Sequence, residues 1–197
     1  KVAIEIITKT GVLTDDEFAK VKEHAVHSRT ILEHTSGVNE TAIEVAAHHH
    51  ERLDGKGYPD NLKEEDIGKF AQMAAIIDVY DAMTSRRCYQ KQFQPTETLR
   101  KLYEWNNLYN RNLVEQFIRC AGIYPVGTLV RLESGLLGVV LEHSGKSLLH
   151  PVVRIVFDTK YVRHVMPYDI DLAKSDKDKV ENYELPDKWN IKAELYL

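Results

Sequence analysis

The chain has 197 residues, of which 43% are hydrophobic and 28% are charged, a balance that is ordinary for a globular protein. Its net charge of −4 provides no general attraction for duplex nucleic acid or an anionic membrane surface, so we expect neither as a partner. The two cysteines, Cys88 and Cys120, are far apart and favour a reducing cytoplasm over a disulfide framework, and no run of about 18 apolar residues indicates a membrane span.

About the first 120 residues have the apolar spacing of helices. Thr14 and Glu17 form a capping box, with Thr14 at the N-cap, and the helix that follows carries His24. Further helices are predicted over about 40–51, over about 65–84, from Pro95 onward and over about 112–120. The helix over 65–84 is apolar nearly all round, so we expect it to be buried on every side.

The pattern changes after about residue 122. Short runs rich in β-branched residues, over 126–133, 137–141, 152–157 and 161–166, are separated by turn residues such as Gly, Ser and Asp. These runs predict a small antiparallel β unit in the form of a partial barrel. From about residue 171 the chain has mixed charge and weak patterning, which predicts an extended tail laid on the body with Trp189 and Tyr196 as anchors.

We therefore predict a mainly α chain in three parts. These are a helical bundle over residues 1–122, a small antiparallel β subdomain over 123–170 and a charged C-terminal tail over 171–197. The chain opens on Lys1 within an apolar segment rather than on Met, which indicates a fragment of a longer polypeptide.

The most informative segment is a run of three histidines and a glutamate, His48 to Glu51, which leads into a glycine-containing loop that ends at Pro59. Imidazole and carboxylate groups are ligands that Fe, Mn and Zn accept. Because neighbouring helical residues point about 100° apart, we expect His49 and His50 to reach two different ions, and His48 to stay outside the metal site or exposed. Two adjacent metals are the usual device for phosphate-ester hydrolysis.

Asp78 lies in the helix that we expect to be buried, where a carboxylate needs an ion pair or a metal, and we favour a metal. Spacing alone leaves His24 open between a surface histidine and a ligand. Asp81, one turn after Asp78, could orient a ligand or pair with an arginine. Arg87 and Lys91 either hold a phosphate or form the solvated cationic end of a helix.

Together these residues resemble the HD-GYP phosphodiesterases, a branch of the HD metal-hydrolase superfamily that degrades cyclic dinucleotides. The resemblance covers about residues 1–120 and rests on segments 11–17, 24, 49–52, 54–59, 77–85 and 87–89 in that order. It implies an HD-type helical bundle with two or three divalent ions, Fe or Mn foremost. The implied metal ligands are His24, His49, His50 and Asp78.

The resemblance also implies roles for residues around the metals. Lys1 corresponds to the active-site lysine that follows the family's His-Asp pair. The implied substrate contacts are Arg87, Lys91 and Tyr58. The residues that would shape the site are Glu51, Asp54, Gly55, Gly57, Pro59 and Asp81.

Two features depart from the family pattern. The His-Asp pair does not occur in the sequence, which places the remaining ligands upstream of Lys1 and makes the chain by itself incomplete, and Gln90 stands where the family has a lysine or arginine. We predict a cytoplasmic, metal-dependent phosphodiesterase for cyclic di-GMP or cyclic GMP-AMP in bacterial second-messenger signalling. The alternative is a non-catalytic dinucleotide-binding or regulatory module; an HD phosphohydrolase for mononucleotides is disfavoured by the loop. Protein partners such as diguanylate cyclases, and a homodimer, are further expectations.

Overall fold

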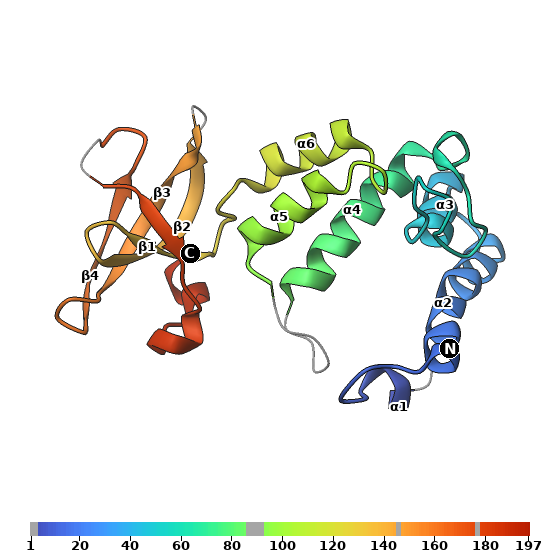
Figure 1. Ribbon diagram of the computed structural model, residues 1–197, viewed down its shortest axis with the longest axis horizontal. Coiled ribbons are helices and arrows are strands. Elements are labelled where there is room, and N and C mark those ends of the chain that lie inside the picture. Colours follow the sequence, from blue (N-terminus) through green and yellow to red (C-terminus); the bar gives the residue numbers. More distant parts are fainter. Residues whose placement is uncertain (1–3, 86–92, 145–146, 176–177) are drawn as a thin grey trace. The chain divides into compact units, whose positions relative to one another are not determined.

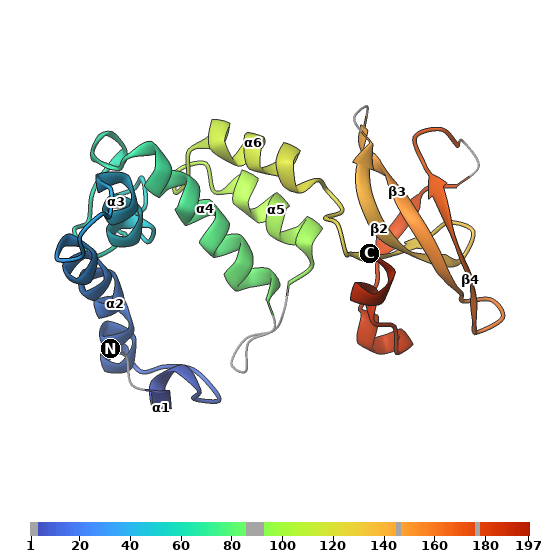
Figure 2. The same cartoon turned by 180° about the vertical axis from the view of Figure 1, so that it is seen from behind.

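The computed structural model describes residues 4–85, 93–144, 147–175 and 178–197. The chain divides into two compact units, Lys1–Phe117 and Ile118–Leu197 (Figures 1 and 2). The boundary falls inside a helix, whereas the sequence predicted a boundary after residue 122. Among the described residues, no helix is both long and apolar enough to cross a bilayer.

Helices form the first unit. They are α1 (Ile4–Ile7), α2 (Asp15–Glu33), α3 (Glu40–His48), a 3-10 turn η1 (Glu64–Asp66), α4 (Lys69–Thr84), α5 (Pro95–Glu104) and α6 (Arg111–Ala121), which continues into the second unit. The predicted capping box is confirmed, because the Thr14 hydroxyl accepts from Glu17 N at 3.2 Å and the Glu17 carboxylate accepts from Thr14 N at 2.7 Å. Helix α3 packs against both α2 and α4 (Figure 1).

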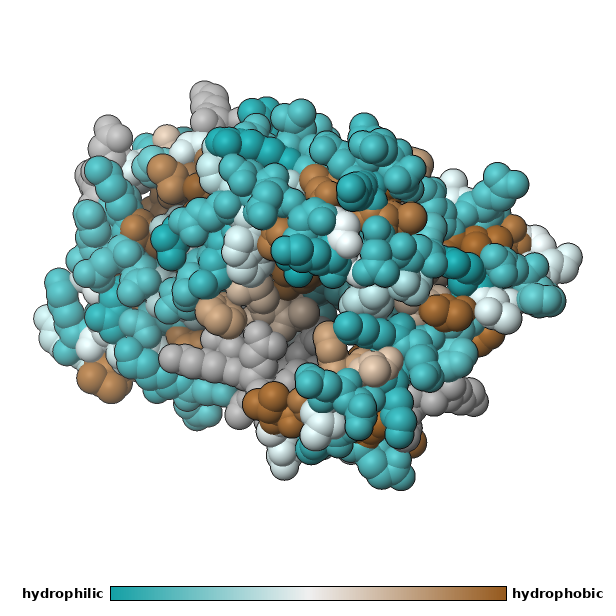
Figure 3. Space-filling view, turned by 45° about the vertical axis from the view of Figure 1, so that its right-hand side comes forward, coloured by the Kyte–Doolittle hydropathy of each residue, from teal (hydrophilic) through white to brown (hydrophobic). Residues whose placement is uncertain are grey.

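Helix α4 is not buried on every side, so that prediction is wrong. Its buried residues are Ala71, Ala75, Ile76 and Met83. Phe70, Met73 and Ile77, spaced three and four residues apart on another face, are 57%, 39% and 53% exposed. The sequence of α4 is apolar nearly all round, but the other described residues cover only part of its apolar surface. Figure 3 shows apolar patches interspersed in a mainly hydrophilic surface.

The second unit is a five-stranded antiparallel sheet in the order β4-β3-β2-β1-β5. Its strands are β1 (Leu129–Leu132), β2 (Leu136–Ser144), β3 (Ser147–Asp158), β4 (Arg163–Asp171) and β5 (Val180–Tyr183). Register shifts interrupt the pairing of β2 with β3 and of β3 with β4, which bends the sheet. The prediction of helices followed by a small antiparallel β unit is confirmed, but the label mainly α describes only the first unit.

Both faces of this sheet carry a hydrophobic cluster. Successive residues of a strand point to opposite faces, so the neighbours Leu129 and Val130 belong to different clusters. Leu129 belongs to a cluster completed by Ile191 and Ala193 from the end of the chain. Val130 belongs to a second cluster, with Val140, Ile155 and Leu172.

The segment after Asp171, predicted as an extended tail, is part of the sheet unit. It supplies β5, which pairs with β1, and two short 3-10 helices, η2 (Pro186–Trp189) and η3 (Ala193–Tyr196). As the sequence predicted, Trp189 and Tyr196 pack against the body, here against the cluster that contains Leu129.

Candidate metal centre

Three histidines and one aspartate come together from α2, the end of α3 and α4. His24 lies on α2, His49 and His50 directly follow α3, and Asp78 lies on α4. The Nε2 atom of His24 lies 3.4 Å from Nε2 of His49 and 3.0 Å from Nε2 of His50. Nδ1 of His50 lies 3.4 Å from Oδ2 of Asp78. The structure thus brings together the four residues that the sequence analysis expected as metal ligands.

The end of α3 changes how the two neighbouring histidines are used. The sequence predicted a helix to about Glu51, in which His49 and His50 would point toward two ions. The helix ends at His48 instead, and the ring centroids of His49 and His50 lie 4.1 Å apart. One nitrogen from each of His24, His49 and His50 lies within 4.8 Å of the other two. Within the described residues, these three side chains therefore fit around a single ion.

Backbone carbonyls set the tautomers of two of these histidines. His24 Nδ1 lies 2.7 Å from Val21 O, and His49 Nδ1 lies 3.1 Å from Val45 O and from Ala46 O. A carbonyl oxygen can only accept, so both Nδ1 atoms donate, and in the neutral form of each ring the lone pair is on Nε2. Two lone pairs facing each other at 3.4 Å are unfavourable without a cation between them. The arrangement, with the far nitrogen bound to a carbonyl, is the usual one for metal-ligating histidine.

His50 is partly buried, with 20% of its side chain exposed. Burial, together with the neighbouring His49 and His24, lowers the pKa of His50 to about 3. The imidazole is therefore neutral near pH 7, as a metal ligand must be. The three imidazoles form a donor set that suits a divalent transition metal, and the Asp78 carboxylate lies beside it against Nδ1 of His50.

The loop over residues 51–62, here called the glycine loop, is anchored by Glu51. This side chain is 2% exposed, and its two oxygens accept from Asp60 N at 2.7 Å and from Leu62 N at 3.1 Å. Because both oxygens bind backbone amides of the loop, Glu51 holds the loop rather than reaching the three histidines.

The glycine loop places an aromatic ring on the histidine cluster. Tyr58 stacks on His50 with 4.6 Å between ring centroids and 30° between planes, and Tyr58 N donates to His50 O at 3.3 Å. Burial, with the nearby Asp78 carboxylate, raises the pKa of Tyr58 to about 12, so the phenol keeps its proton. Pro59 follows through a cis peptide bond.

The remaining loop residues shape the turn that precedes Tyr58. Asp54 accepts from Lys56 N at 3.1 Å and pairs with Arg52 at 3.2 Å. Gly55 adopts a φ of +71°, which favours glycine. Asp54 and Gly55 therefore stabilise the local turn, and the contacts of Asp54 are with Arg52 and Lys56 rather than with the histidines.

Four other predicted site residues lie on α4 or outside the described residues. Asp81 is exposed and accepts from Ser85 Oγ at 2.9 Å. Lys1, Arg87 and Lys91 fall in segments outside the described residues, so their roles stay predictions.

Sequence reasoning missed two groups beside the cluster. Lys22 Nζ lies 4.8 Å from the ring centroid of Phe18 and 5.4 Å from that of Tyr58. Arg29 of α2 contacts Asp60 of the glycine loop. The Lys22–Tyr58 and Arg29–Asp60 pairs each join residues more than 30 positions apart, so no local pattern in the sequence could have indicated them.

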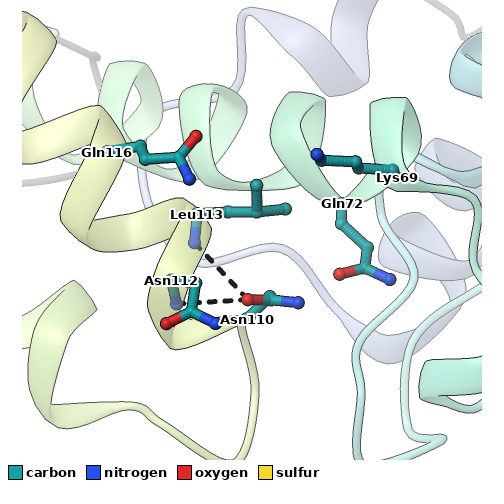
Figure 4. A pocket seen from close by; sticks show the side chains of 6 residues that line it. All are labelled: Lys69, Gln72, Asn110, Asn112, Leu113 and Gln116. Atoms are coloured by element: carbon teal, nitrogen blue, oxygen red, sulfur yellow. Dashed lines mark hydrogen bonds between the residues drawn. The ribbon is translucent and has the colours of Figure 1, made fainter.

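A separate pocket of about 400 Å³ opens in the first unit (Figure 4). It is lined by Lys69, Gln72, Asn110, Asn112, Leu113 and Gln116. Asn110 Oδ1 accepts from the backbone N of Asn112 at 3.1 Å and of Leu113 at 3.4 Å, which caps the start of α6. None of the predicted site residues lines this pocket, so it is not part of the histidine cluster.

A family model of the HD domain matches residues 2–113 of the chain. The chain is 41% identical over 188 residues to a cyclic di-GMP phosphodiesterase of Pseudomonas aeruginosa, covering 95% of this chain and 45% of that protein. It is 37% identical over 116 residues to a cyclic di-GMP phosphodiesterase of Thermotoga maritima, covering 58% and 32%. It is 36% identical over 140 residues to the 3'3'-cGAMP-specific phosphodiesterase 1 of Vibrio cholerae, covering 71% and 27%. The chain spans less than half the length of each of these relatives.

Proposed function

Because the chain belongs to the HD domain family, we propose that it is the metal-binding part of a phosphodiesterase that hydrolyses cyclic dinucleotides. The names of the curated relatives, which are phosphodiesterases for cyclic di-GMP or 3'3'-cGAMP, suggest the substrate class. The observation that carries the proposal is the cluster of His24, His49 and His50 with Asp78 beside it.

A divalent ion held by these residues would neutralise phosphate charge and make a bound water more acidic. Fe or Mn is the proposed metal, as the family resemblance implies, and the three imidazole nitrogens are donors that such ions accept. His24 and His49, fixed by backbone carbonyls, direct their Nε2 atoms to one point.

Tyr58 is the proposed substrate contact within the described residues. Its phenol stays protonated, so the hydroxyl can donate a hydrogen bond to a phosphate or base oxygen. Its ring lies against His50, which places any such contact next to the proposed metal. Arg87 and Lys91 are proposed as further phosphate contacts.

The test is turnover by purified protein loaded with Mn or with Fe, assayed with cyclic di-GMP and with 3'3'-cGAMP in parallel. A His49→Ala, His50→Ala double variant should lose its metal and more than about 100-fold of its activity, since even partners outside the ligand shell contribute 10–100-fold. His27→Ala, which removes an exposed histidine of α2, is the matched control and should keep both. Wild-type turnover by the double variant would refute the proposed site.

The sequence analysis leaves one alternative open, a module that binds a cyclic dinucleotide without cutting it. Calorimetric binding of either dinucleotide, with no linear product after long incubation with metal, would support this candidate over hydrolysis.

A further inference from the structure

A polar cluster of three residues ties the glycine loop to two helices. It consists of Arg29 on α2, His48 at the end of α3 and Asp60 directly after Pro59, and is called the Arg29 cluster below. Arg29 Nη2 donates to Asp60 Oδ2 and lies 2.9 Å from His48 Nε2. His48 Nε2 lies 3.1 Å from Asp60 Oδ2. None of the three is among the expected metal ligands.

The chemistry of the Arg29 cluster suits a fixed contact. Arg29 and His48 are partly buried, with exposed side-chain fractions of 28% and 20%, and Asp60 is exposed, at 39%. Hydrogen bonds from Arg29, and from His48, lower the pKa of the Asp60 carboxyl against the raising effect of its partial burial. The Arg29 guanidinium and the Asp60 carboxylate form a charge-assisted contact, and His48 Nε2 lies within reach of both and can bond to one of them at a time.

Asp60 is the residue through which the Arg29 cluster reaches the metal site. Its side chain binds α2, while its backbone N–H donates to the buried Glu51 at 2.7 Å. Tyr58, two residues earlier, stacks on His50. Asp60 is therefore bound through both its side chain and its backbone. The Tyr58 ring that covers His50 lies two residues before it.

We propose that Arg29 is a positioning residue of this site, which acts through Asp60 to keep Tyr58 on His50. Arg29 contacts His48 and Asp60, which are not among the proposed metal ligands. Loss of the contact frees the glycine loop, so substrate binding weakens while metal binding persists. The expected change in KM rests on the proposed function, whereas the expected loosening of the glycine loop does not.

The kinetic experiment compares metal-loaded wild type with Arg29→Gln, Asp60→Asn and the double variant, using cyclic di-GMP. We expect KM to rise about 10-fold with kcat within about 2-fold and unchanged metal content, because a hydrogen bond to a charged group contributes to this extent. The double variant should be no worse than either single variant, since both remove one contact. Arg29→Lys should recover part of the loss. The matched control is Arg154→Gln, which breaks the Arg154–Asp169 pair in the second unit and should change neither parameter.

A second readout needs no activity. Hydrogen exchange of the Tyr58, Asp60 and Leu62 amides reports how firmly the glycine loop is held, because these amides donate to His50 and Glu51. In Arg29→Gln we expect exchange about 10-fold faster at these amides and unchanged exchange at the amides within α4. If wild type turns over neither dinucleotide, the proposed function fails and exchange alone decides the role of Arg29. Unchanged loop exchange, or equally faster exchange throughout the first unit, would overturn the positioning role.

Discussion

At the scale of single residues, Gly57 is the point where the glycine loop comes closest to the preceding chain. A Cβ atom on Gly57 would lie 2.4 Å from Glu51 Cα and 2.5 Å from Arg52 N. These are backbone atoms, so no side-chain rotation can relieve the overlap. The missing side chain is therefore what allows Tyr58 to lie on His50.

Gly57→Ala should destabilise the first unit by about 3 kcal/mol, because the loop must move away from Glu51. Metal retention and turnover should fall with it. Gly68→Ala is the matched control: the added Cβ meets only the carboxylate end of Glu44, which can rotate away, so the loss should stay near 1 kcal/mol. Urea unfolding of both variants measures the difference, and equal stabilities would contradict the argument.

Glu184 is a nearly buried carboxylate between β5 and η2 that binds three partners. It accepts from Trp189 Nε1 and from Lys188 Nζ, each at 3.0 Å, and pairs with Arg131 at 3.0 Å. Burial alone would raise the pKa of Glu184, but the hydrogen bonds from Trp189 and Lys188 outweigh it and lower the pKa below its ordinary value of 4.5. A lowered carboxyl pKa stabilises the folded state above that value, and the contribution is lost as pH falls through the folded pKa.

The second unit of the wild type should therefore lose more stability between pH 6 and about pH 3 than Glu184→Gln does. Trp189 fluorescence during urea unfolding, recorded in a Trp105→Phe background, follows this unit. Glu194→Gln, which removes the charge of an exposed glutamate on η3, should keep the wild-type dependence on pH. If the unfolding free energy of Glu184→Gln falls with pH as steeply as that of the wild type, the Glu184 contacts do not cause the pH dependence.

At the scale of elements, α2 depends on its capping box. The box satisfies backbone groups at the start of the helix that carries both His24 and Arg29. Glu17 also pairs with Lys9 at 2.6 Å, which ties the preceding segment to the cap.

Thr14→Ala should destabilise the first unit by about 1 kcal/mol, because Glu17 N then lacks its acceptor. Thr41→Ala, at an exposed threonine near the start of α3, should stay within about 0.5 kcal/mol of wild type. Thermal unfolding followed by circular dichroism compares them. A Thr14→Ala midpoint equal to that of Thr41→Ala would mean that the cap contributes nothing.

At the scale of the whole molecule, the two units each contain one tryptophan. Trp105 lies in the first unit and Trp189 in the second, and the sequence has no other. The proposed metal ligands all lie in the first unit. Metal bound there stabilises that unit alone if the two units unfold independently.

Removal of metal by a chelator should lower the unfolding midpoint reported by Trp105 in a Trp189→Phe variant by about 10 °C, for an ion present at about 100 times its Kd. The midpoint reported by Trp189 in Trp105→Phe should not move. In the His49→Ala, His50→Ala background the chelator should have no effect on either signal. Equal shifts of both tryptophans would show that the units unfold together.

Local features of the fold were predictable from sequence. The capping box of α2, the order of helices before strands and the antiparallel pairing follow from neighbouring residues, and each is confirmed. Predictions that needed the packed structure were wrong: α4 has an exposed apolar face, and α3 ends before His49. A helix sequence shows which residues are apolar, but not how many neighbours cover them.

The sequence by itself determined the chemistry available to this protein. The imidazoles, the carboxylate and the glycine loop with its tyrosine are written in short motifs, and they indicated the family that the family model also matches. Only the tertiary structure decided how these groups are used. It directs Nε2 of His24 and His49 to one point, turns Glu51 toward the loop and joins Arg29 to Asp60. The physical reason is that such contacts join residues 9 to 31 positions apart, so chain folding and not local pattern sets their distances.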